Sequence, residues 1–287
     1  MLGPLILLVT AGLWGSAFVA QKCGADHLGP FTVLFARSAL ASLFLAVWTR
    51  LAKGAGYTRR AVLGGALSGF MLFLAELAQQ IGIGSSSPGI SAFLTTNYLL
   101  FVPVIGFFVG RRPPRLVWVF VAFALVGSFL LSVAPGEGFR IGSGEAWTLL
   151  CAILFAVQIL VVDRFAPRTD VLAFSCVAQV VATILPAPFL FLPSESAHFV
   201  ATDLVPALFP ILYLGIVSSG IAYTLQSFGQ VRTPPTLASL IMSLESVFGA
   251  FAGYLFPIFF TWIGIKNIAD PGQVPDSVKW SFYVGAI

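Results

Sequence analysis

Hydrophobic and polar positions alternate along this chain in long blocks. Apolar runs of about 18 residues or more recur from one end of the sequence to the other, separated by short segments that contain Gly, Pro, Arg and Asp. An α-helix needs a run of about this length to cross a bilayer. The pattern predicts nine transmembrane helices, at 3–21, 31–49, 61–83, 89–109, 116–134, 146–162, 171–192, 206–229 and 236–257.

The composition argues against a soluble protein. Hydrophobic residues make up 58% of the 287-residue chain and charged residues only 9%, whereas a soluble domain carries about 25% charged residues. So few charges do not make a water-facing surface, and the connecting segments are too short to form a separate soluble domain. We therefore expect an all-α polytopic membrane protein that contacts the lipid bilayer along most of its length.

Lys and Arg are distributed unevenly between the two sets of alternating loops. One set of loops holds only Lys22 and Arg140. The loops on the other side hold Arg50, Lys53, Arg59, Arg60, Arg111, Arg112, Arg115, Arg164, Arg168 and Arg232. Lys and Arg accumulate in cytoplasmic loops, so this distribution predicts a cytoplasmic N-terminus, and we expect the inner (plasma) membrane of a bacterium. The basic loops are short and lack interleaved aromatic residues, so nucleic-acid binding is not expected.

Two segments of the chain match each other without gaps, 76–106 (ELAQQIGIGSSSPGISAFLTTNYLLFVPVIG) and 223–253 (YTLQSFGQVRTPPTLASLIMSLESVFGAFAG). At a constant offset of 147 residues, Gln79 falls on Gln226, Gly82 on Gly229, Pro88 on Pro235 and Gly106 on Gly253. The offset corresponds to a shift of five helices, and because five is odd, the second copy is inverted in the membrane. Inverted repeats are typical of secondary transporters, whose substrate site lies near the midplane where the repeats meet.

Several segments together resemble the EamA family of the drug/metabolite transporter superfamily. They are LWGSAFVAQK (13–22), HLGPFTVLFAR (27–37), ELAQQIG (76–82), LFVPVIGFFVGRRP (100–113), LFAVQILVVDRFAPRTD (154–170) and SLESVFGAFAGYLF (243–256). The resemblance covers about residues 3–256. It implies a bundle of ten helices in a 5+5 inverted repeat, cytoplasmic termini, and export of metabolites, amino acids or drugs.

The expected organisation is a first repeat at 3–134, a second at 144–257 and a divergent tail at 258–287. The departure from the family begins near Pro257, where the repeat predicts a basic turn followed by a last helix. The chain continues instead as PIFFTWIGIKNIADPGQVPDSVKWSFYVGAI. We therefore expect the tenth helix to be missing or aberrant.

Three ionisable residues lie well inside the predicted spans, Arg37, Glu76 and Glu245. Charge within a membrane is costly and usually faces a partner or a wet cavity, so we expect Arg37 to pair with one of the two carboxylates. Glu245 lies near the bilayer midplane, where burial opposes ionisation and a nearby cation or water favours it. Such a group can exchange a proton or a cationic substrate, which makes Glu245 the main candidate for coupling and Glu76 the second.

The offset of 147 adds a further relation, because it places Glu76 on Tyr223 and Tyr98 on Glu245. Each homologous pair then holds one carboxylate and one phenol, and these four side chains are predicted to ring a central cavity. The remaining candidates for substrate contact or coupling are Gln79, Gln226, Asn97 and Trp14. Each has a structural alternative. Gln79 and Gln226 could form hydrogen bonds between helices, Asn97 could cap or cross-link helices, and Trp14 could be a packing or interfacial residue.

Other kinds of chemistry find little support. The sequence contains no phosphate-binding loop, no HExxH motif and no Ser/His/Asp set, and its widely spaced Cys23, Cys151 and Cys176 form no metal-binding pattern. We predict no enzyme activity, no cofactor and no metal. The predicted function is secondary transport of a small metabolite or drug-like solute, as an exporter that works by alternating access with proton coupling as an option. The alternative is a channel-like or purely structural membrane protein; self-association into a homodimer stays open.

Overall fold

The computed structural model describes residues 2–52, 56–86, 88–110, 114–132, 142–197, 199, 201–249 and 251–252. Throughout these ranges the chain is helical or in turns, with no strand. The helices are α1 (Leu2–Ala25), α2 (Pro30–Leu51), α3 (Arg59–Ser85), α4 (Pro88–Thr95), α5 (Tyr98–Phe108), α6 (Arg115–Ser132), α7 (Ser143–Phe165), α8 (Val171–Ile184), η1 (Ala187–Phe191), α9 (Pro193–Ser196), α10 (Ala201–Leu212), the π-helix η2 (Tyr213–Ala222), α11 (Tyr223–Gln230) and α12 (Pro235–Met242).

Seven described segments are long and apolar enough to cross a membrane: Leu2–Ala25, Pro30–Leu51, Arg59–Ser85, Gly89–Phe108, Ser143–Phe165, Val171–Phe191 and Asp203–Gln230. They coincide with seven of the nine predicted spans. The other two predicted spans, 116–134 and 236–257, are helical where described, as α6 and the shorter apolar segment Pro235–Gly249. Both continue into residues outside the described ranges, as does the whole of the predicted divergent tail.

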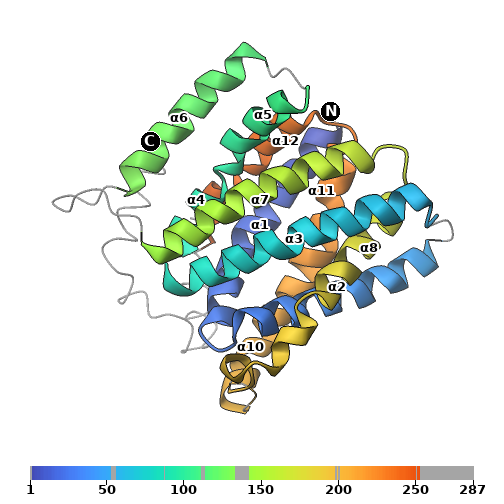
Figure 1. Ribbon diagram of the computed structural model, residues 1–287, viewed down its shortest axis with the longest axis vertical. Coiled ribbons are helices and arrows are strands. Elements are labelled where there is room, and N and C mark those ends of the chain that lie inside the picture. The colour runs from blue at the N-terminus through green and yellow to red at the C-terminus, as the bar shows by residue number, and fades with distance from the viewer. Residues whose placement is uncertain are drawn as a thin grey trace.

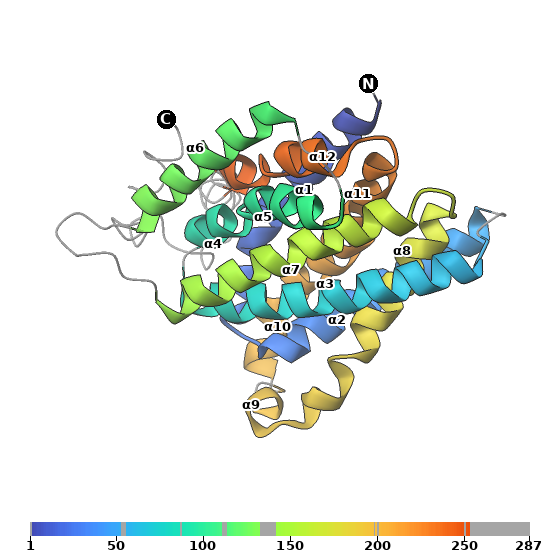
Figure 2. The ribbon, with the colours of Figure 1, turned by 45° about the horizontal axis from the view of Figure 1, so that its top comes forward.

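The helices pack into one bundle in which long helices lie side by side (Figures 1 and 2). The central helix α3 packs against α7 and α8. On the other side of the bundle, the continuous segment formed by α10, η2 and α11 packs against α1 and α2. α2 and α8 are in direct contact, and α6 lies at the margin beside α4 and α5 (Figure 1).

Glycine allows two helices to approach closely at the centre of the bundle. A Cβ atom on Gly15 of α1 would lie 2.6 Å from the backbone oxygen of Glu245 and 2.7 Å from the backbone nitrogen of Gly249. Only a residue without a side chain fits there, and small residues at such crossings are how membrane helices pack closely. Gly15 therefore fixes α1 against the helical turn that carries Glu245.

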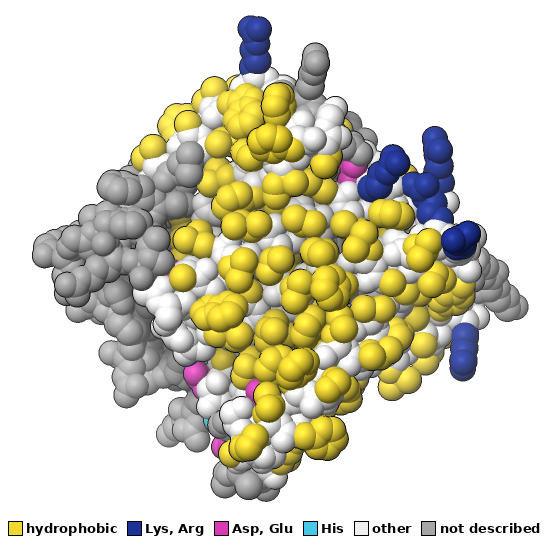
Figure 3. All heavy atoms as spheres, in the orientation of Figure 1, with side chains coloured by type: hydrophobic (Ala, Val, Ile, Leu, Met, Phe, Trp, Pro, Cys, Tyr) yellow, Lys and Arg dark blue, Asp and Glu magenta, His cyan; other side chains and the backbone are white. Residues whose placement is uncertain are grey.

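Most of the described basic residues lie at one end of the bundle, which we call the basic side. Lys22 lies at the opposite end, where its Nζ donates to the backbone oxygen of Gly84 (3.2 Å), and Arg37 is buried inside the bundle. Arg50 ends α2, Arg59 and Arg60 begin α3, and the guanidinium of Arg60 donates to the backbone oxygen of Arg164 at the end of α7 (2.6 Å). The first turn of α1 lies at the same end, because Gly3 packs against Arg232. In Figure 3 the Lys and Arg side chains project from the margins, and the broad face between them is hydrophobic, as a lipid-facing surface must be. Lys53, Arg111, Arg112 and Arg140 lie outside the described residues.

Candidate functional site

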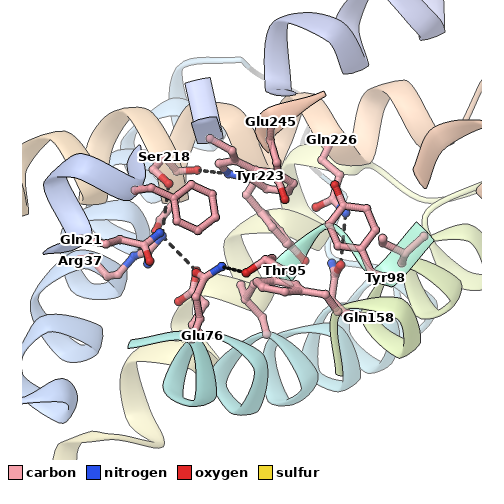
Figure 4. A pocket seen from close by; sticks show the side chains of 17 residues that line it. Gln21, Arg37, Glu76, Thr95, Tyr98, Gln158, Ser218, Tyr223, Gln226 and Glu245 are labelled. Atoms are coloured by element: carbon pink, nitrogen blue, oxygen red, sulfur yellow. Dashed lines mark hydrogen bonds and ion pairs between the residues drawn. The ribbon is translucent and has the colours of Figure 1, made fainter. Parts of the chain in front are cut away.

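A polar cavity lies where α1, α2, α3, α5, α7, η2 and α11 meet (Figure 4). Its volume is about 30 Å³, which holds about two water molecules. Eight of the nine residues that the sequence predicted for the site line this one cavity: Trp14, Arg37, Glu76, Gln79, Tyr98, Tyr223, Gln226 and Glu245. The ninth, Asn97, is not among the lining residues; its amide donates to the backbone oxygen of Leu94 (2.9 Å).

Arg37 forms the ion pair that the sequence predicted, and its partner is Glu76. The distance from Arg37 Nη2 to Glu76 Oε1 is 3.1 Å, and the two side chains are 3% and 6% exposed. Arg37 also donates from Nε to Ser219 Oγ (2.9 Å) and from Nη2 to Ser218 Oγ (3.2 Å). We call Arg37, Glu76, Ser218 and Ser219 the ionic network. Its two charges cancel, and it joins α2 and α3 to the π-helix η2.

The π-helix supplies backbone acceptors as well as hydroxyls. Trp14 Nε1 donates to the backbone oxygen of Ser218 (3.2 Å), and Gln179 Nε2 donates to that of Ser219 (3.0 Å). A π-helix has a wider turn than an α-helix and frequently marks a functional site. Here side chains from α1 and α8 hold the wide turn in place beside the cavity, so Trp14 serves as a structural donor in addition to lining the site.

A second set of polar contacts contains no formal charge. Ser68 and Tyr223 share a hydrogen bond of 2.9 Å between their hydroxyls, Gln158 Nε2 donates to Ser68 Oγ (3.3 Å), and Gln226 Nε2 donates to Gln158 Oε1 (3.2 Å). We call these four residues the amide network. It joins α3, α7 and α11, and all its members are buried. The sequence analysis named Tyr223 and Gln226 and missed Ser68 and Gln158. Their polarity inside apolar runs was the available signal.

Glu245 differs from Glu76 in its surroundings. Its side chain lines the cavity, the residue is only 3% exposed, and its Oε1 has no hydrogen-bond partner in the described part of the chain. The buried hydroxyl of Tyr98, another lining residue, lies beside this carboxyl group, and the two interact without meeting the geometry of a full hydrogen bond. Across the described ranges no Lys or Arg forms an ion pair with Glu245. A buried carboxylate without a countercharge is costly, so this position favours a ligand that brings a positive charge or a proton.

Two helix interruptions stand directly before Tyr98 and Glu245. Turn residues Thr96 and Asn97 separate α4 from α5, and turn residues Ser243 and Leu244 separate α12 from the helical turn that begins at Glu245. The positions differ by 147 in both cases (243 − 96 and 244 − 97). Discontinuous membrane helices commonly form the substrate and ion sites of transporters.

The side-chain bonds at the two interruptions are also equivalent. Thr96 Oγ1 donates to the backbone oxygen of Phe93 (2.7 Å), and Ser243 Oγ donates to that of Leu240 (2.8 Å). Donors and acceptors are again 147 residues apart (243 − 96 and 240 − 93). A hydroxyl thus satisfies a carbonyl in the last turn of each broken helix, where no following amide is in position to do so.

An apolar helical bundle around a buried, charged cavity defines a multi-pass integral membrane protein. The sequence agrees with this class. The model of the EamA-like transporter family matches residues 1–133 and 142–268. The chain therefore belongs to the EamA-like transporter family, as the resemblance predicted.

Individual relatives agree with the family. Two proteins of Archaeoglobus fulgidus described as uncharacterized transporters are 30% and 26% identical to the chain; the alignments cover 91% and 84% of the chain and 92% and 74% of the relatives. A protein of Streptantibioticus cattleyicolor described as a probable terminal-alkyne amino-acid exporter is 25% identical over 90% of the chain and 84% of its own length. A protein known from a crystal structure shares the fold, with a TM-score of 0.65, 18% identity, and coverage of 98% of this chain and 93% of that one.

Proposed function

We propose that this chain is a secondary active transporter that exports a small metabolite or drug-like solute by alternating access. The observation that carries the proposal is the contrast between the two cavity carboxylates. Glu76 is neutralised by Arg37, whereas no Lys or Arg among the described residues pairs with Glu245, which is buried in the same cavity. With Arg37 counted as +1 and each carboxylate as −1, the site lacks one positive charge. A proton or the cationic group of a cargo supplies it, and exchange between the two couples transport to a proton gradient.

The 5+5 inverted repeat is part of the proposal and has structural support. α3 packs against α7 and α8, and its predicted counterpart, the segment from α10 to α11, packs against α1 and α2. Under an offset of five helices, α7 and α8 are the counterparts of α1 and α2, so each contact has an equivalent in the other half. The matching interruptions and hydroxyl bonds agree with the same relation. We keep 3–134 and 144–257 as the two repeats; whether a tenth helix follows is a question for residues outside the described ranges.

Residues at equivalent positions of the two proposed repeats also line the cavity together. At the offset of 147, Glu76 and Tyr223, Gln79 and Gln226, Tyr98 and Glu245, and Leu72 and Ser219 all line the cavity. A site built from equivalent positions of two inverted halves opens to either side by equivalent movements.

The missing positive charge favours a cargo that carries an amine or another cationic group, which would exchange with a proton at Glu245. The exporter from Streptantibioticus cattleyicolor is named for an amino-acid cargo, and the ammonium of an amino acid meets this requirement. The volume of about 30 Å³ is too small for such a molecule and equally too small for a pore. So small a cavity supports a carrier that changes conformation to admit its cargo better than a channel.

We further propose that the basic side is cytoplasmic, with the N-terminus on that side, in a bacterial inner membrane. A homodimer stays a prediction, because the structure contains a single chain.

Flux measured in proteoliposomes tests the proposal. We expect efflux of an amino acid or organic amine that saturates with cargo concentration and accelerates under an imposed proton gradient. Flux that rises linearly with concentration and ignores the gradient would favour the channel alternative. No flux for any amine or amino acid in a broad screen would contradict the carrier.

A further inference from the structure

Two polar networks cross the cavity at different depths. Along α3, Ser68 and Glu76 are eight residues apart (76 − 68), which is about 12 Å at a rise of 1.5 Å per residue. Ser68 is nearer to Arg59, where α3 begins on the basic side. Leu72 lies between them and lines the cavity. The amide network thus lies between the cavity and the basic side, and the ionic network lies towards the opposite side.

The partner helix shows the same order. Tyr223 and Gln226 lie near Gln230, the end of α11 that is followed by Arg232 on the basic side. Ser218 and Ser219 lie farther from that end. Each network therefore ties α3 to the segment η2–α11 at one end of the cavity. Figure 4 shows Arg37 and Ser218 on one side of the cavity and Gln158 and Gln226 on the other.

We infer that the two networks are the gates of the transport cycle: the amide network closes the basic side, and the ionic network closes the opposite side. This inference rests on the proposed carrier function and assigns roles to Ser68 and Gln158, which the sequence did not single out. Gln158 is the central member of its gate, because it donates to Ser68 and accepts from Gln226. A single side chain of α7 therefore connects both ends of this gate.

The difference in charge makes the gates unequal. Opening the amide network exposes neutral groups, and water that enters can replace their hydrogen bonds at little net cost. Opening the ionic network also requires Arg37 and Glu76 to separate, so the attraction between two full charges is lost together with the hydrogen bonds, and entering water offsets this loss only in part. Without cargo the cavity therefore opens preferentially to the basic side. For an exporter with a cytoplasmic basic side, this is the side from which cargo loads.

Sided labelling of a single cysteine tests the two gates. In a chain with Cys23, Cys151 and Cys176 replaced by alanine, Leu72→Cys places a thiol between the networks. Its rate of reaction with a membrane-impermeant maleimide is measured in sealed vesicles of both orientations. Arg59→Cys, made separately in the same background, identifies the orientation that exposes the basic side, because Arg59 is exposed at the start of α3. We expect Leu72→Cys to react faster from the basic side.

Gate variants then give opposite results. Gln158→Leu should raise the labelling rate from the basic side about tenfold, the size of effect expected for losing one or two buried hydrogen bonds, and leave the opposite side unchanged. The double variant Ser218→Ala/Ser219→Ala should raise labelling from the opposite side and leave the basic side unchanged. Gln80→Leu is the matched control. Like Gln158, Gln80 is a buried glutamine with a hydrogen bond to a neighbouring helix, here to the backbone oxygen of Gln21, but it lies on α3 and belongs to neither network. It should change neither rate.

Ser68→Ala provides a second test of the basic-side gate if Gln158→Leu does not assemble. The inference is overturned if either variant raises labelling from the opposite side, or from both sides equally, or from neither. Labelling and flux report separately. If the labelling results are as expected but no flux is found, the carrier function is contradicted and the assignment of the two gates stands. Flux with labelling that is insensitive to Ser68 and Gln158 would overturn the gates and keep the carrier.

Discussion

The pair Arg37–Glu76 supports a quantitative prediction about stability. At 3.1 Å and an effective dielectric constant of about 20, the attraction between the two charges is about 5 kcal/mol. Removing one partner leaves the other charge buried, so Arg37→Met and Glu76→Gln should each lower the free energy of unfolding by about 3–5 kcal/mol. The double variant removes both charges, and it should be more stable than the sum of the single effects by about 2–3 kcal/mol.

Denaturant titration of the purified protein in mixed detergent micelles, followed by tryptophan fluorescence and circular dichroism, measures these values. Lys22–Asp26 is the matched control, because its distance is also short (3.0 Å) but its side chains are 29% and 52% exposed. A cycle with Lys22→Met and Asp26→Asn should show a coupling below about 0.5 kcal/mol. If the effects at Arg37 and Glu76 add within about 0.5 kcal/mol, the two residues do not form a tight buried pair and the reasoning fails.

Three further predictions follow from other parts of the structure. Glu195 is 1% exposed and accepts hydrogen bonds from Thr32 N (2.9 Å) and Thr32 Oγ1 (2.7 Å) at the start of α2. Glu195→Ala should therefore lower the free energy of unfolding by about 1–3 kcal/mol. An unchanged denaturation midpoint would contradict this capping role. Gly15→Val should reduce the yield of folded protein in fluorescence-detected gel filtration, because its side chain collides with the turn of Glu245, whereas Gly12→Val should not, because a Cβ there meets nothing within 4 Å. Reporter fusions after Arg60 and Arg168 should be active in the cytoplasm and one after Ser196 outside; the reverse pattern would refute the proposed orientation.

Most of the fold could be predicted from the sequence because the transmembrane helices follow directly from the lengths of the apolar runs. An apolar run of spanning length has few alternatives to a helix, and seven of the predicted spans appear at their expected positions. The pairing of Arg37 was predictable for a similar reason. Only three ionisable groups lie inside the spans, and a buried guanidinium leaves few choices of partner.

Other features depend on contacts that the sequence does not display. The π-helix η2 and the interruptions at Thr96 and Ser243 coincide with short polar stretches inside apolar runs, and such stretches do not by themselves show that a helix is broken. The π-helix and the interruptions persist because side chains from the same or neighbouring helices bind the freed carbonyls. Gln158 was missed because a single amide in a membrane helix has many uses, and only its two partners identify the network. Glu195 likewise lies in a connecting segment that gives no sign of capping α2.

The central claim, that Glu245 is the coupling or cargo-binding acid, is tested most directly by Glu245→Gln in proteoliposomes. The change keeps the shape of the side chain and removes its charge; Glu145→Gln, in the first turn of α7 and outside the cavity lining, is the matched control. We measure cargo flux under an imposed proton gradient for both variants and for the unmodified protein. We expect Glu245→Gln to fold normally and to lose gradient-driven flux, whereas Glu145→Gln should retain it. Unchanged rate and pH dependence in Glu245→Gln would show that Glu245 is a structural residue and would contradict the account.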